Sequence, residues 1–443
     1  MVNDPLSDGA LASAPLKLGR QNGDFRGESG AKPGATGCAG AFSLAYEARA
    51  GAKGFVGGGR AGETRQHDGG SMSGARAGSN ITAHYRVRAD ADSIEDRARK
   101  IAVEQSVEMP LAGVRDPAIL EEIVGKVRAI SDAGGGYFDV TVELCARTVG
   151  RDAGQLLNIL FGNTSMHNDI SLEDAQIPPA LLAAFGGPNH GLDGLRKLAG
   201  AERRAMTCSA LKPQGMSSPQ LADLAFQFAK GGADFIKDDH GLADQDYSPF
   251  EQRVAACARA MRDAERVTGR LTHYVPSLWG DFEEIDHRLD FAASEGLSVA
   301  MLAPAIIGAS NFVALKRKHP KFCFFAHPSF TGGARISPPL YARLYRLFGA
   351  DAVIFATFGG RFGYSQATCR AIADACREPL GELSPATPVP AGGLTLRRVA
   401  ETLDFYGKDA MLLIGGDLLL AEHDKLADET RAFVRAVETY SCG

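Results

Sequence analysis

The chain has 443 residues, of which 45% are hydrophobic and 23% are charged, and its 48 Lys and Arg residues against 53 Asp and Glu residues give a net charge of -5. These values are ordinary for a globular protein of two or three domains. They disfavour a nucleic-acid binder, which needs a basic excess, and a membrane protein, which needs apolar runs of roughly 18 residues or more.

The first part of the chain, residues 1–80, holds 18 of the 52 glycines and few large apolar side chains. Too little apolar surface is present to offset the entropy of ordering, so we expect a disordered extension, or the translation of an upstream start codon, and exclude it from the fold. The eight cysteines are scattered without a C-x-x-C pair, and the N-terminus lacks the pattern of a secretory signal. Both features favour a reducing, cytoplasmic location.

Residues 81–200 are expected to form a small α+β domain of the ferredoxin-like type. Alternating apolar residues indicate strands, and a spacing of three to four indicates helices. The expected order is a strand at 81–89, a helix at 93–106, a second helix at 116–133, a strand at 137–146 and a helix at 152–162.

Residues 201–443 are expected to form a (β/α)8 TIM barrel, the catalytic domain. Eight short apolar runs recur there (TCSALK, ADFIK, LTHYV, VAMLA, FCFFA, AVIFA, PVPAG and MLLIG), with helical periodicity between them. A doubly wound open sheet is the main alternative, but no G-x-G-x-x-G turn follows the first strand. Because barrel enzymes carry their chemistry at the C-terminal ends of the strands, the polar residues after each run are the candidates.

The second barrel strand ends in GGADFIKDDHG, which places Lys237, Asp239 and His240 at the barrel mouth together with Asp238. Alternation puts Lys237 and Asp239 on one face, and Asp238 and His240 on the other, although neighbours can converge at a strand end. A desolvated lysine has a lowered pKa and can act as a base or nucleophile, and carboxylates beside it favour a divalent cation. The alternative is a solvated loop at the rim.

The first barrel strand ends in ALKPQG, so Lys212 lies at the mouth of the adjacent strand. We expect mutual repulsion to lower the pKa values of Lys212 and Lys237, which suits proton abstraction next to a carbonyl group. A surface lysine before a turn-forming proline is the alternative reading.

The last two strands end in paired glycines, whose backbone N–H groups can surround a phosphate group. Two weaker candidates follow strands five and six: His327 could polarise a substrate oxygen or be a packed core residue, and Arg361 lies in a glycine-flanked loop that could close over a ligand. The residues of the expected phosphate corner are Ala391, Gly392, Gly393, Gly415 and Gly416.

From about Ile81 to the C-terminus, the sequence resembles the large subunit of ribulose-bisphosphate carboxylase (RuBisCO). LKPQG resembles the K-P-K motif of that family, GGADFIKDDH resembles G-G-x-D-x-x-K-x-D-E, and AGGL and IGG resemble its phosphate-binding glycines. The resemblance implies an N-terminal α+β domain, a C-terminal barrel and a homodimer, or an assembly of dimers, in which each active site uses the neighbour's N-terminal domain. Glu104 and Asn163 fall on positions that line the family's site.

The resemblance also implies that Lys237 is carbamylated by CO2 and binds Mg2+ together with Asp239. The third ligand, Glu in the family, is His240 here. Other departures are Gln214, Pro328, Ile354 and Arg361, where the family has Lys, Arg, His and Lys, respectively. The losses remove groups for a distal phosphate and for CO2 addition, as in the non-carboxylating RuBisCO-like proteins.

We therefore expect an enzyme that binds a phosphorylated ketose or keto acid and performs metal-assisted enolisation, isomerisation or decarboxylation without CO2 fixation. Substrates of the methylthioribulose-phosphate or oxo-isoapionate-phosphate type are implied by the resemblance. The alternatives are true carboxylation of ribulose bisphosphate, a Schiff-base aldolase using Lys212, and a non-catalytic barrel with a binding or stress-response role.

Overall fold

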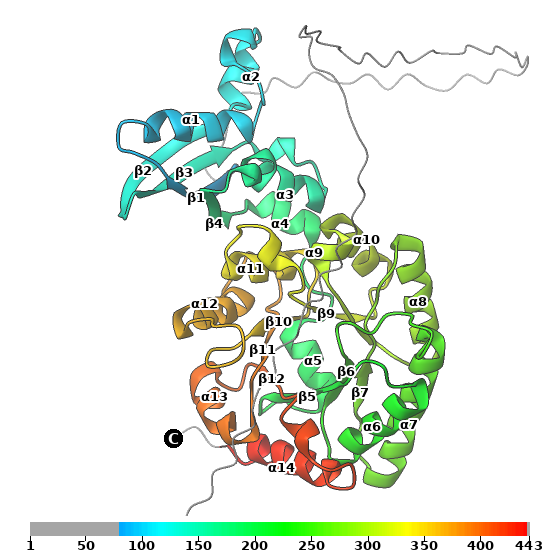
Figure 1. Cartoon of the computed structure of the whole chain (residues 1–443). Coiled ribbons are helices and arrows are strands. Elements are labelled where there is room, and N and C mark those ends of the chain that lie inside the picture. The colour runs from blue at the N-terminus through cyan, green and yellow to red at the C-terminus, as the bar shows by residue number, and fades with distance from the viewer. Residues whose placement is uncertain (1–78, 441–443) are drawn as a thin grey trace, which may run out of the picture. The chain divides into compact units, whose positions relative to one another are not determined.

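The computed structural model describes residues 79–440, so the glycine-rich extension expected over residues 1–80 lies almost wholly outside the described residues. The first described part is a four-stranded antiparallel sheet with strand order β2-β3-β1-β4, against which α1 packs (Figure 1). Its elements, together with the helices that lead to the barrel, are β1 (Ile81–Arg88), α1 (Ile94–Glu104), α2 (Pro117–Glu122), β2 (Lys126–Gly134), β3 (Tyr137–Leu144), α3 (Ala153–Phe161), β4 (Ile170–Gln176), α4 (Pro179–Phe185) and α5 (Gly191–Ala199).

The prediction of a helix over residues 116–133 is wrong for the second half of that segment. The helix α2 ends at Glu122, and Lys126–Gly134 forms the edge strand β2, which pairs with β3. Three glycines, 134–136, supply positive φ angles of 79°, 64° and 76° at the turn, which other residues adopt only at a cost. The hairpin therefore overrides the local helical spacing. The strand β4 is a further element that the sequence analysis did not predict.

The second described part is a barrel of eight parallel strands with helices around it, which confirms the expected fold class (Figure 1). Each expected apolar run forms one of its strands. These strands are β5 (Met206–Leu211), β6 (Phe235–Asp238), β7 (His273–Val275), β8 (Val299–Leu302), β9 (Cys323–Ala326), β10 (Ala352–Ala356), β11 (Thr387–Ala391) and β12 (Met411–Leu413). The helices are α6 (Ser218–Lys230), α7 (Phe250–Thr268), α8 (Phe282–Ser294), α9 (Pro304–Ile307), α10 (Ala309–Lys318), α11 (Pro338–Phe348), α12 (Gln366–Arg377), α13 (Val399–Tyr406) and α14 (Leu426–Glu438).

Hydrogen bonding and proximity close the barrel. The strands pair in the orders β12-β5-β6-β7 and β8-β9-β10-β11, a bridge between Ser277 and Met301 joins β7 to β8, and β11 lies beside β12. Apolar side chains fill the interior, and Leu192 and Leu195 of α5 pack against this interior cluster. A filled interior leaves the mouth of the barrel as the place for a site.

The antiparallel sheet is tied to a loop at the barrel mouth. Leu172 of β4 accepts a hydrogen bond from the backbone N–H of Ser337 (2.9 Å) and donates one to the carbonyl oxygen of Arg335 (2.8 Å). The Arg335 side chain also donates to the carbonyl oxygen of Ile170 (2.9 Å). The loop that follows β9 is therefore held by the edge of β4. Among the described residues, no helix combines the length and apolar character needed to cross a lipid bilayer.

Candidate active site

The strand β6 divides its residues between the barrel interior and the surrounding helices. Phe235 belongs to the interior cluster, and Lys237, two residues later, points the same way and lines a cavity at the mouth. Asp238 faces the other way and is fully buried behind the strand. His240 differs from simple alternation: it lies beyond the strand end and joins Lys237 and Asp239 in the cavity.

The Lys237 amine is buried, with only 3% of the residue exposed, and its Nζ donates a hydrogen bond to the carbonyl oxygen of Asp238 (2.7 Å). Burial lowers the pKa of Lys237, while Cys208 and Asp239 act in the opposite direction and Lys212 adds a smaller lowering effect. Burial, rather than repulsion between two lysines, is therefore the main cause. A lowered pKa increases the fraction of neutral amine near neutral pH, and only the neutral amine can take up a proton or add to CO2.

Lys212, Asp239 and His240 form a chain of polar contacts. The Nζ atom of the half-buried Lys212 donates to Asp239 Oδ1, and His240 Nδ1 lies 3.2 Å from the same oxygen. Burial alone would raise the pKa of Asp239, but these contacts with His240 and Lys212 hold it well below its usual range. Lys212 thus forms an ion pair with Asp239, which the sequence analysis did not anticipate.

His327 stacks on His240, with ring centroids 4.5 Å apart and an angle of 6° between the planes. The backbone N–H of Ser329 donates to His327 Nδ1 (3.2 Å), which assigns the proton of the neutral ring to Nε2. Burial, followed by repulsion from Lys237 and His240, lowers the pKa of His327 to about 2. The ring is therefore a neutral hydrogen-bond donor at neutral pH.

The five residues of the expected phosphate corner all line the same cavity. Two of the glycines differ in what surrounds them. Gly393 has a φ of 141°, and a Cβ there would lie 2.5 Å from the Cα of Gly360, so a side chain would collide with backbone. Gly416 has nothing within 4 Å of the position of a Cβ, so its backbone borders open space.

The loops around this corner are tied together. The backbone N–H of Arg361 donates to the carbonyl oxygen of Gly392 (2.9 Å), and Asp417 Oδ2 accepts from the backbone N–H of Leu396 (2.8 Å). The Arg361 guanidinium lies over the ring of Phe362, 5.4 Å from its centroid. Arg361 therefore brings a cation to the cavity from a loop that is anchored to the glycine corner.

The cavity has a volume of about 800 Å³, enough for a phosphorylated sugar. Its wall between β9, β10 and α11 is largely apolar and includes Pro328, Ile354, Tyr341 and Tyr345. The sequence analysis did not single out the two tyrosines. Their spacing of four residues places them on one face of a helix, but the same spacing is typical of core residues.

Glu104 and Asn163 do not line the cavity of their own chain. They contact each other instead, with Asn163 Nδ2 donating to Glu104 Oε1 (2.8 Å). His273 and Trp279 both have backbone partners: His273 Nε2 lies 2.9 Å from the carbonyl oxygen of Leu198, and Trp279 Nε1 donates to that of His240 (3.1 Å).

The family model described as "Ribulose bisphosphate carboxylase large chain, catalytic domain" matches residues 191–423. A protein of Rhodospirillum rubrum named 5-methylthioribulose-1-phosphate isomerase is 52% identical over 359 residues, which cover 81% of this chain and 96% of that protein. The chain belongs to the RuBisCO large-chain family. Within this family, its relatives at 49–52% identity are RuBisCO-like proteins.

A solved RuBisCO-like structure, a solved RuBisCO structure and one further relative support this placement. The RuBisCO-like protein from Rhodopseudomonas palustris has a TM-score of 0.77 and 45% identity, covering 82% of this chain and 99% of that one. The dimeric archaeal RuBisCO from Hyperthermus butylicus has a TM-score of 0.76 and 25% identity, covering 83% and 91%. A Shouchella clausii protein named as a putative 2,3-diketo-5-methylthiopentyl-1-phosphate enolase is 28% identical, covering 76% and 93%. The RuBisCO-like chain described here is an enzyme.

RuBisCO enzymes generally use Mg2+ held by a carbamylated lysine. Among residues 79–440, no three His, Cys, Asp or Glu side chains form a ready-made metal site. Asp239 offers one carboxylate and His240 an imidazole at the cavity, and Lys237 could add an anionic ligand only as a carbamate. The burial and lowered pKa of the Lys237 amine favour the neutral form that CO2 addition requires, so these residues fit a divalent cation if Lys237 is carbamylated.

Proposed function

We propose that this RuBisCO-like enzyme isomerises a ketose monophosphate of the 5-methylthioribulose 1-phosphate type by moving a proton next to a carbonyl group. The observation that carries the proposal is one cavity that joins a lysine pair, a glycine corner and an apolar wall. The similarity to an isomerase that is named for this substrate supports the choice.

The glycine corner, Ala391–Gly393 with Gly415 and Gly416, would bind the phosphate group through backbone N–H groups. The resemblance implies that Pro328 and Ile354 replace groups that hold a second phosphate in a carboxylase, so that end of the cavity would suit an uncharged methylthio group. This arrangement favours a monophosphate over a bisphosphate. It orients the substrate with its carbonyl group near Lys212 and Lys237.

We assign Lys212 as the acid/base residue. Its amine, once deprotonated, would take the proton from the carbon next to the carbonyl group, and the electron pair of the C–H bond would form a C=C bond while the carbonyl π pair moves to oxygen. The hydroxyl group on that carbon then gives its proton to the former carbonyl oxygen and becomes the new carbonyl group, while the abstracted proton returns to the former carbonyl carbon. The product is an isomer, with no change in oxidation state overall. His327 would donate a hydrogen bond from Nε2 to the oxygen that gains charge.

Lys237, Asp239 and His240 would hold the Mg2+ ion. Addition of the Lys237 amine to CO2 forms an N–C bond and releases a proton, which leaves an anionic carbamate oxygen as a ligand. When bound, the cation stabilises negative charge on the substrate oxygen. An acidic substrate, decarboxylated rather than isomerised, is the second candidate, and the exposed guanidinium of Arg361 at the cavity favours it because it could bind a carboxylate.

We also propose a homodimer in which Glu104 and Asn163 face the cavity of the second copy. This arrangement explains why the two residues bond to each other away from their own cavity. Mixing inactive Glu104→Gln and Lys237→Met variants should restore activity, because a hybrid dimer then contains one intact site. A mixture that stays inactive, although hybrid dimers form, would contradict the arrangement.

The test of the proposed function uses proton NMR in D2O with 5-methylthioribulose 1-phosphate, Mg2+ and bicarbonate. We expect deuterium to enter the substrate or product at the carbon next to the carbonyl group, and the Lys237→Met variant to show no exchange. Ribulose 1,5-bisphosphate with labelled bicarbonate is the comparison substrate. Fixation of label, with no exchange in the methylthio sugar, would overturn the proposal in favour of carboxylation.

A further inference from the structure

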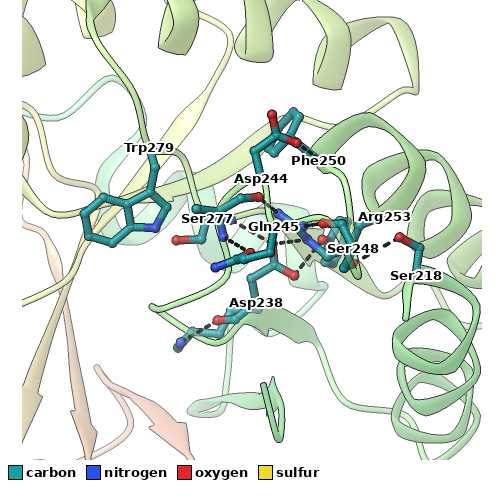
Figure 2. A network of polar contacts seen from close by, with 12 residues as sticks. Ser218, Asp238, Asp244, Gln245, Ser248, Phe250, Arg253, Ser277 and Trp279 are labelled. Atoms are coloured by element: carbon teal, nitrogen blue, oxygen red, sulfur yellow. Dashed lines mark hydrogen bonds and ion pairs between the residues drawn. The ribbon is translucent and has the colours of Figure 1, made fainter. Parts of the chain in front are cut away.

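A fully buried polar network lies directly behind the cavity, on the opposite face of β6 (Figure 2). Asp238, which stands between Lys237 and Asp239 in the sequence, pairs with Arg253 of α7 across 3.1 Å, and neither side chain is exposed. Its carboxylate also accepts hydrogen bonds from the hydroxyl group of Tyr274 (2.7 Å) and the backbone N–H of Ser277 (3.1 Å). Three elements therefore fix one carboxylate.

The same residue holds the cavity lysine. The Lys237 amine donates to the backbone carbonyl oxygen of Asp238 (2.7 Å), so the side chain of Asp238 determines where that peptide lies and where the amine points. A lysine side chain has four rotatable bonds, and its end is otherwise poorly defined. Fixing the peptide thus orients the amine without any contact between the network and the cavity.

Arg253 extends this effect to the loop that follows β6. Its guanidinium donates to the carbonyl oxygens of Ser248 (2.8 Å; Figure 2) and Ala243 (2.7 Å). Trp279 donates to the carbonyl oxygen of His240 (3.1 Å). The loop that begins with His240 is therefore fastened from behind at several points. It is a rigid frame for the groups that it presents to the cavity.

Stability alone does not account for a charged pair at this place. Two ions lose much of their hydration when buried, and apolar side chains of similar volume are often as good or better for stability. Arg253 and Tyr274 nevertheless converge on the carboxylate of Asp238, the one residue that stands between Lys237 and Asp239.

We propose that Asp238, Arg253 and Tyr274 form a positioning unit that orients the Lys237 amine and the adjoining Asp239 from behind the strand. They touch no substrate and are not catalytic residues. The role of Lys237 in this inference rests on the proposed function. The orientation of its amine, however, can be measured without any substrate.

The test compares Tyr274→Phe with Tyr85→Phe. Both tyrosines are 1% exposed and donate one buried hydrogen bond, but Tyr85 donates to the carbonyl oxygen of Leu160 (2.6 Å) in the antiparallel sheet, away from β6. The first readout is brief acetylation by acetic anhydride, with the ratio of labelled Lys237 to labelled Lys212 determined by mass spectrometry. The second readout is kcat and KM for the methylthio sugar phosphate.

We expect Tyr274→Phe to raise the labelling ratio about threefold or more and to lower kcat about tenfold or more with little change in KM, because small misplacements of a reacting group are costly. Tyr85→Phe should lose about as much thermal stability as Tyr274→Phe but leave both readouts at the wild-type level. Equal effects of the two variants, or a wild-type labelling ratio in Tyr274→Phe, would overturn the inference.

Asp238→Asn provides a second variant, since it keeps the shape and removes the charge. If it folds, it should change the labelling ratio in the same direction, and an unchanged ratio would count against the unit. If it does not fold, Tyr274→Phe decides alone. Should the wild-type protein turn over no methylthio sugar, the proposed function fails while the labelling ratio still tests the positioning unit.

Discussion

The substitution Gly416→Ala separates a glycine that faces a ligand from a glycine that is needed for packing. No atom lies within 4 Å of the position of the added methyl group, and the φ angle of Gly416 lies outside the left-handed region. At a compatible position this change is neutral or stabilises the protein by about 0.5 kcal/mol through the unfolded chain. The methyl group would, however, stand where we place the phosphate group.

The expected effect on binding follows from the lost backbone contact. A hydrogen bond to a charged group contributes about 1.5–3 kcal/mol, and each 1.4 kcal/mol is roughly a factor of ten. We therefore expect KM for the monophosphate, and the inhibition constant of inorganic phosphate, to rise roughly 10- to 150-fold. Denaturant unfolding should show an unchanged or slightly higher free energy of unfolding.

Gly393→Ala is the matched comparison. Its methyl group would lie 2.5 Å from the Cα of Gly360 at a φ of 141°, so we expect the free energy of unfolding to fall by about 1–3 kcal/mol. A Gly416→Ala protein with wild-type KM and wild-type inhibition by phosphate would refute the assignment of the phosphate corner.

Three further outcomes are expected. Lys237→Met should lower kcat about a thousandfold and leave inhibition by inorganic phosphate unchanged; weakened inhibition would mean a collapsed cavity. Lys212→Met removes a contact that lowers the pKa of Asp239. In the wild-type protein the ionised Asp239 stabilises the fold above about pH 4, and this stabilisation is lost as the pH falls further. The unfolding midpoint of the variant should therefore fall less than that of the wild-type protein between pH 5 and pH 3. The pKa of His327 is lowered to about 2 in the folded protein, so between pH 7 and pH 5 only the unfolded chain takes up a proton at this residue, below about pH 6.5, and acid destabilises the fold. His327→Gln should therefore reduce the fall in Tm between pH 7 and pH 5. The control variant His287→Gln, at an exposed position, should not.

The barrel was predictable because each parallel strand is buried on both faces and so appears as a short apolar run. The lysine at the end of β6 could be found in the same way, since a charged residue directly after such a run stands out. The residues 126–133 could not be assigned correctly, because their helical spacing is overridden by pairing with β3 and by the three glycines of the turn.

The ion pairs of the site could not be predicted from the sequence. Lys212 directly follows β5 and Asp239 directly follows β6, and the strand register, in which Leu211 lies opposite Asp238, brings their side chains together. Arg253 and Tyr274 come from a helix and a strand further along the chain, and nothing in their local sequence marks them as neighbours of Asp238. Contacts of this kind depend on the folded backbone and not on the local sequence pattern.

The side chains of β6 alternate between the barrel cavity and the buried network behind the strand, and this alternation restricts which sequence changes the segment can accept. A one-residue insertion or deletion before Lys237 would exchange the two faces, so that a carboxylate would enter the cavity and an amine would be forced against Arg253. A substitution changes one side chain and leaves the others on their faces, whereas a change in length moves every side chain that follows it. Variation in chain length among functional relatives should therefore begin only after His240, where the loop leaves the barrel.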